Sequence, residues 1–174
     1  MSDTPANTRR RKLFVHIGMH KTGTTSIQKY YARNYEAAMR RGILFPKAAS
    51  FLEHHFPLAL AMTTPERRKE LTNGLGAHDV EQLAQRSDNE VLAEFSDELA
   101  RHPDADVLIS TEAFCLLRGD EVARLCARFG GFEICPIFFI RAFNDFAHSF
   151  YYSYVADSAG ALPPASSRVG ASSP

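Results

Sequence analysis

Apolar segments alternate with amphipathic segments along this chain, and the alternation predicts an α/β protein. Four apolar runs have the length of buried strands: 12–17, 43–45, 107–110 and 134–140. Six stretches have the pattern of helices: 24–41, 55–63, 65–72, 79–101, 120–129 and 145–155. Strands that alternate with helices form a parallel sheet covered on both faces. We therefore expect a three-layer fold with a central parallel sheet.

The two ends of the chain differ in composition from the part between them. Residues 1–11 are polar, and residues 156–174 are rich in Pro, Ser, Ala and Gly without apolar periodicity. Segments of this kind cannot bury enough apolar surface to fold, so both are predicted to be disordered. A single folded domain is expected over 12–155.

Charge and cysteine usage narrow the class of protein. The 174 residues include 20 Lys and Arg against 20 Asp and Glu, so no overall positive field favours nucleic acid. Cys115, Cys126 and Cys135 lack metal-ligand spacing, and their odd number argues against a disulfide framework. The apolar runs are far shorter than the roughly 18–20 residues that cross a bilayer. We expect a soluble, cytoplasmic protein with no metal and no transmembrane segment.

The first predicted strand runs directly into a loop rich in glycine and hydroxyl groups. Gly18 and Gly23 have the spacing of the phosphate-binding pattern G-x-x-x-x-G-K-[ST], but Thr24 stands where the lysine belongs and the lysine is at position 21. Amides at the start of the next helix would attract an anion. Side-chain donors would come from Lys21, Thr22, Thr24, Thr25 and Ser26. The alternative is a capped strand–helix junction that binds no anion.

The segment from His20 to Ser26 resembles the 5′-phosphosulfate loop of sulfotransferases that use 3′-phosphoadenosine 5′-phosphosulfate (PAPS). The family has a second signature, an arginine after a strand and a serine eight residues later, which Arg141 and Ser149 match. Phe143 stands where the family usually has proline. The resemblance implies a P-loop-like fold over 12–155 that lacks the family's C-terminal part.

The resemblance also implies roles for these residues. The 5′ end of the nucleotide would be held by Lys21, Thr22, Gly23, Thr24, Thr25 and Ser26. Arg141 and Ser149 would hold its 3′-phosphate. Lys21 would lie at the oxygen that bridges the sulfuryl group and the leaving phosphate, where negative charge grows during transfer.

Three further positions are candidates for chemistry or substrate binding. Glu112 follows the strand at 107–110 and is a candidate general base; alternatively, Glu112 or Thr111 merely caps a turn. His20 competes for the role of base, or orients the loop. His54 and His55 are candidates for substrate contact or are plain loop residues, because no further ligand at metal spacing lies nearby.

The expected activity is transfer of a sulfuryl group from PAPS to a hydroxyl or amine of a small molecule or carbohydrate. One alternative is a truncated, non-catalytic fragment that binds the nucleotide. Another is a P-loop kinase or NTPase, against which stand Thr24 and the lack of an aspartate placed after a strand to hold Mg²⁺.

Overall fold

The computed structural model describes residues 9–19, 21–73 and 75–159. Four parallel strands form one sheet in the order β2-β3-β1-β4. Their bounds are Lys12–Gly18 (β1), Ile43–Leu44 (β2), Asp106–Thr111 (β3) and Glu133–Phe139 (β4). The four predicted strands and the parallel arrangement are thus confirmed. The order places β1 in the interior of the sheet.

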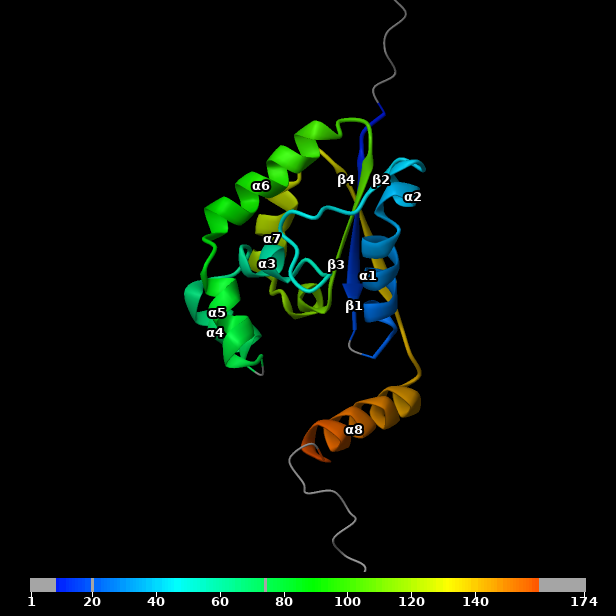
Figure 1. Ribbon diagram of the computed structural model, residues 1–174, viewed down its shortest axis with the longest axis vertical. Helices are drawn as coiled ribbons and strands as arrows, with labels where there is room; N and C mark the ends of the chain where they lie inside the picture. The colour runs from blue at the N-terminus through cyan, green and yellow to red at the C-terminus, as the bar shows by residue number, and fades with distance from the viewer. Residues whose placement is uncertain (1–8, 20, 74, 160–174) are drawn as a thin grey trace, which may run out of the picture.

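Helices cover both faces of this sheet (Figure 1). One face carries α1 (Thr24–Arg33) and α2 (Tyr35–Met39), and the other carries α3 (Phe56–Leu60), α6 (Asp88–Arg101) and α7 (Gly119–Arg128). The short helices α4 (Pro65–Thr72) and α5 (Ala77–Ala84) extend the second layer. A 3₁₀ helix, η1 (Glu112–Leu116), follows β3, and α8 (Phe143–Ala159) lies beyond the carboxyl ends of the strands.

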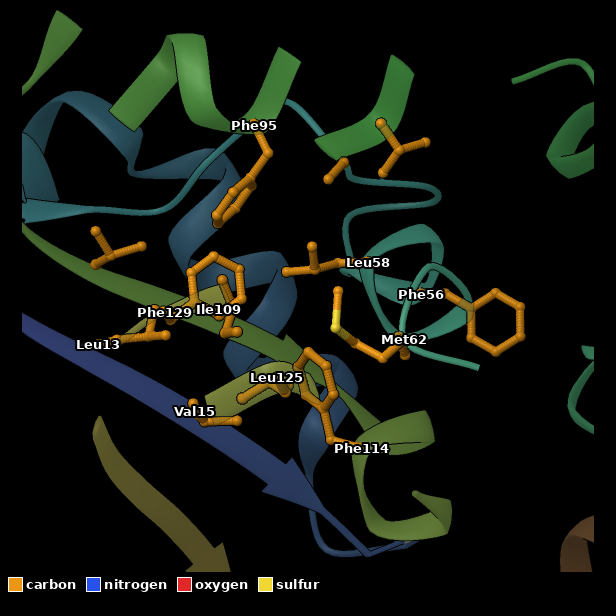
Figure 2. Packing of buried hydrophobic residues seen from close by; sticks show 14 of the residues in the cluster. Leu13, Val15, Phe56, Leu58, Met62, Phe95, Ile109, Phe114, Leu125 and Phe129 are labelled. Carbon is orange, nitrogen blue, oxygen red and sulfur yellow. The ribbon is translucent and has the colours of Figure 1, made fainter. Parts of the chain in front are cut away.

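The hydrophobic core lies between the sheet and the layer that contains α6 and α7 (Figure 2). Leu13 and Val15 alternate along β1 and face this layer, where Phe95 of α6 meets Phe129 edge-on at 5.6 Å between ring centroids. Ile109 of β3 is completely buried beside them. Full burial of one such side chain is worth about 1.5–3 kcal/mol, so this cluster holds the strands that carry the site.

Two predicted helices are each interrupted in the structure. The helix predicted over 24–41 breaks at Asn34, whose side-chain amide donates to the Tyr30 carbonyl at 2.8 Å and so competes with the helical pattern. Gly42, with φ +75°, follows the second piece as the sequence predicts.

The prediction of one helix over 79–101 is also wrong, because the structure has two helices there. It starts earlier, at Ala77, ends at Ala84 and resumes at Asp88. Ser87 and Glu90 form a capping box, in which the serine hydroxyl accepts from the Glu90 amide at 3.3 Å and the glutamate accepts from the Ser87 amide at 2.7 Å. The apolar positions stay in register across the break, which hides it from a periodicity argument.

The end of β1 is the point where connections diverge. The chain leaves β1 for β2 on one side, and it later crosses from β3 over β1 to β4 on the other. Ile17 pairs with Thr111 of β3, and Gly18 pairs with Phe139 of β4, so three strand ends meet at one edge. Ligands of open parallel sheets bind at such a switch point.

Most of the two predicted tails, namely residues 1–8 and 160–174, lies outside the described residues. The last helix is longer than predicted and reaches Ala159. Across the ranges that the structure describes, no helix is long and apolar enough to cross a membrane.

Candidate anion-binding site

The turn after β1 needs glycine because of a close approach. A Cβ atom on Gly18 would lie 2.5 Å from the Thr24 hydroxyl oxygen and 2.7 Å from its methyl carbon. The Thr24 side chain is buried against this glycine, and its hydroxyl donates to the Met19 carbonyl at 3.4 Å. Thr22 donates to the same carbonyl at 2.7 Å. Both hydroxyls therefore brace the loop from within.

Two of the described residues in the loop have a backbone in the left-handed region. Lys21 has φ +64° and Gly23 has φ +86°. A left-handed residue with a side chain costs about 1–2 kcal/mol, and such strain is typical of functional sites. The fold of the loop therefore imposes the left-handed backbone conformation of Lys21.

Helix α1 begins in a form suited to an anion. Its N-cap is Gly23, which has no side chain to accept from the first-turn amides, and its first turn contains no acidic residue. Thr25 and Ser26 are exposed in this turn. The positive end of the helix dipole is thus open toward solvent, as in phosphate-binding helices.

The second predicted motif contacts the first. Arg141, two residues past the end of β4, donates from Nη1 to the Lys21 carbonyl oxygen at 2.9 Å. The two residues are 120 positions apart in the sequence, and they meet because β4 lies beside β1. Arg141 is an exposed residue, so its guanidinium is accessible from solvent next to the loop. Ser149 lies within the second turn of α8 and is partly buried.

Glu112 lies just past the carboxyl end of β3. Thr111 pairs with Ile17, so Glu112 follows at the same edge of the sheet as Gly18. The Thr111 hydroxyl accepts from the Ala113 amide at 3.3 Å and caps the turn. The cap is therefore supplied by the threonine.

Two histidines lie within the electrostatic reach of Glu112. Burial lowers the pKa of His16 and of His54, and the negative charge of Glu112 opposes the shift in both. His54 Nδ1 is buried and has no hydrogen-bond partner among the described residues. His20, the other candidate base, lies outside them.

His55 belongs to the interior of the protein. Its Nε2 donates to the Pro46 carbonyl at 2.9 Å, since a carbonyl can only accept, and its Nδ1 accepts from the Ser110 amide at 3.1 Å. The ring is fully buried, and burial lowers its pKa to about 4. Both ring nitrogens form hydrogen bonds with backbone groups, so neither is available to a substrate.

Sequence reasoning missed a buried polar cluster beneath the loop. His16 Nδ1 lies 2.7 Å from the Ser110 hydroxyl, which also accepts from the Gln28 amide at 3.3 Å. The three side chains are buried and link β1, β3 and α1. The signal in the sequence is one polar residue, His16, inside the apolar run that precedes Gly18.

Comparisons of this chain with protein-family models, with curated proteins and with solved structures find no match. Within residues 9–19, 21–73 and 75–159, no group of three or more His, Cys, Asp or Glu side chains could hold a metal ion.

Replacing Gly18 by alanine should destabilise the protein by about 1–3 kcal/mol, because the new methyl overlaps the Thr24 side chain. Thr24→Ala removes both of the closest atoms, so the double variant should be more stable than the sum of the two single changes predicts. Urea unfolding of the four proteins measures this coupling. Strictly additive losses would show that Thr24 does not impose the glycine.

Lowering the pH should destabilise the fold through His55. Its pKa is about 4 in the folded protein and 6.5 as the ordinary value, so the unfolded chain binds the extra proton first as the pH falls. The contribution of neutral His55 to the free energy of unfolding is complete above about pH 6.5. About 2 kcal/mol of it should be lost by about pH 5. Urea unfolding at both pH values, compared with His55→Gln, isolates this contribution. An equal loss in that variant would assign the pH dependence to other groups.

Proposed function

We propose that this protein transfers a sulfuryl group from PAPS to a hydroxyl or amine acceptor, as a P-loop-like sulfotransferase. The observation that carries the proposal is the 2.9 Å contact from Arg141 to the Lys21 carbonyl. It places a guanidinium beside a strained loop at the start of a helix. Two anionic groups of one nucleotide could therefore be held side by side.

The two parts of this site suit different ends of the nucleotide. The amides at the start of α1, with Thr25, Ser26 and Lys21, would hold the 5′-phosphosulfate. Arg141 would bind the 3′-phosphate through its outward-facing donors, with Ser149 as a second donor from α8. Thr22 and Thr24 would act by keeping the loop in shape.

The transfer needs one base and one group that stabilises the leaving phosphate. The acceptor oxygen or nitrogen attacks sulfur while the bond from sulfur to the bridging oxygen breaks, and its electron pair passes to the phosphate. The Lys21 ammonium meets this growing charge. Glu112, which lies at the same edge of the sheet, would take the acceptor's proton; His20 is the competing base.

A non-catalytic nucleotide-binding protein is the second candidate, and one observation favours it. The apolar side chains around the end of β4 and along α8 are uncovered: Ile140 is 82% exposed, Phe143 79% and Tyr152 71%. A surface of this kind is usual where further structure packs. Nucleotide binding could then persist without a closed site for transfer.

Formation of adenosine 3′,5′-bisphosphate from PAPS tests the proposal. The chain is incubated with PAPS and a panel of phenols, amines and oligosaccharides, with and without a metal chelator. Acceptor-dependent product that resists the chelator supports transfer. Binding of PAPS without product would assign the protein to the non-catalytic class. Mg²⁺-dependent hydrolysis of ATP, without any response to PAPS, would identify an NTPase instead.

A further inference from the structure

A cavity of about 310 Å³ lies among the helices of the second layer, in a part of the chain that the proposed transfer does not use. It is lined by the end of α3, by α4 and α5, and by the start of α6. Its volume is at the lower end of the roughly 300–1,000 Å³ that is typical of small-molecule sites.

The apolar wall of the cavity comes largely from α5. Val80, Leu83 and Ala84 have the i, i+3, i+4 spacing of one helix face and line the cavity together with Leu60 of α3. Neither α4 nor α5 contains a fully buried residue, and Val80 is 37% exposed. An amphipathic helix normally packs this face against other side chains. Here Leu83 packs against the hydrophobic core, whereas Val80 and Ala84 are exposed beside the cavity.

The polar groups on the wall have a positive balance. Arg68 and Lys69 of α4 line the cavity, against one acid, Asp88, at the start of α6. Arg68 forms an ion pair with Asp88 and also donates to the Leu60 carbonyl at 3.4 Å. Two lining cations against one lining anion leave Lys69, which is exposed and also lies within the electrostatic reach of Glu66 on the same helix.

The threonines of the wall present no unmet polar group. Thr63 donates to the Leu60 carbonyl at 2.7 Å, and Thr72 donates to the Arg68 carbonyl at 2.9 Å. A ligand would therefore meet an apolar interior with a cation at its edge.

We propose that the cavity between α3, α4, α5 and α6 binds a small amphipathic carboxylate, with its apolar body against Val80 and Leu83 and its carboxylate at Lys69. The charge complementarity selects an anionic head over a cationic or neutral one. The site is separate from the anion-binding loop and does not depend on the transfer reaction.

Calorimetric titration with decanoate and with decyltrimethylammonium tests this proposal on the whole chain. Decanoate should bind at least about tenfold more tightly than decyltrimethylammonium. Val80→Phe, which fills the cavity, should weaken decanoate binding by about tenfold or more. Val122→Phe is the matched control, because Val122 is similarly exposed on α7 at 44% and does not line the cavity.

The charge variants give an independent readout. Lys69→Glu, on the exposed side of α4, should abolish or reverse the preference for decanoate, whereas Lys29→Glu on α1 should leave it unchanged. Circular dichroism checks that each variant is folded. Absence of binding, equal binding of the two head groups, or decanoate binding that survives both Val80→Phe and Lys69→Glu would overturn the proposal.

Discussion

Lys21→Asn is expected to lower the rate constant for sulfuryl transfer by about 10²–10³-fold, with the affinity for PAPS reduced by less than about tenfold. Lys21 would act on charge that appears only as the bond to the bridging oxygen breaks, so its removal affects the transition state more than the bound donor. Asparagine suits this test because it tolerates the left-handed backbone, at φ +64°, better than alanine does. Single-turnover kinetics separates binding from chemistry.

Lys29→Asn provides the matched control for this variant. It removes the same charge from an exposed position on α1, the helix that follows the loop, and should leave the rate unchanged. Unchanged turnover in Lys21→Asn would remove the lysine from the chemistry, and equal losses in the two variants would indicate a general effect of charge.

Arg141→Ala is expected to weaken binding of adenosine 3′,5′-bisphosphate by about 10–100-fold. Charge-assisted hydrogen bonds to a phosphate contribute about 1.5–3 kcal/mol, and alanine would remove them. The variant also loses the hydrogen bond to the Lys21 carbonyl. A loop that is less well ordered would weaken the binding of every nucleotide, with or without a 3′-phosphate. Titration with AMP, which lacks the 3′-phosphate, separates the two effects.

Arg141→Lys is the conservative partner of that variant. Lysine keeps the charge but cannot donate in the planar, paired geometry of a guanidinium, so a partial loss is expected. Equal weakening of AMP and the bisphosphate in Arg141→Ala would mean that the arginine only braces the loop.

The sequence predicts the elements of this fold better than their boundaries. Apolar runs bounded by polar segments mark the four strands, although β4 at the edge of the sheet is not buried: Phe138 and Phe139 are exposed. The break before α6 follows from a local hydrogen-bond pattern, Ser87 with Glu90, which a search for periodicity passes over. The position of β4 beside β1 depends on the packing of the whole layer, so no local pattern encodes it.

The sequence likewise predicts where the candidate site lies better than it predicts the role of each residue. The glycine and hydroxyl pattern at 18–26 identifies an anion-binding loop, but it does not distinguish donors that face a ligand from those, such as Thr24, that brace the loop. The interior position of His55 was not predictable from its polar neighbours, because tertiary contacts from Pro46 and Ser110 create its environment. His16 is an isolated histidine in an apolar strand, and such a residue belongs to no motif that would predict its buried partners.

Calorimetric titration of the unmodified chain with adenosine 3′,5′-bisphosphate and with AMP, both without Mg²⁺, tests the proposed two-phosphate site most directly. If Lys21 and Arg141 hold two anionic groups of one nucleotide, the bisphosphate should bind at least about 30-fold more tightly than AMP, since a charged pair is worth roughly 2 kcal/mol. Equal affinities for the two nucleotides, or binding that requires Mg²⁺, would contradict the account.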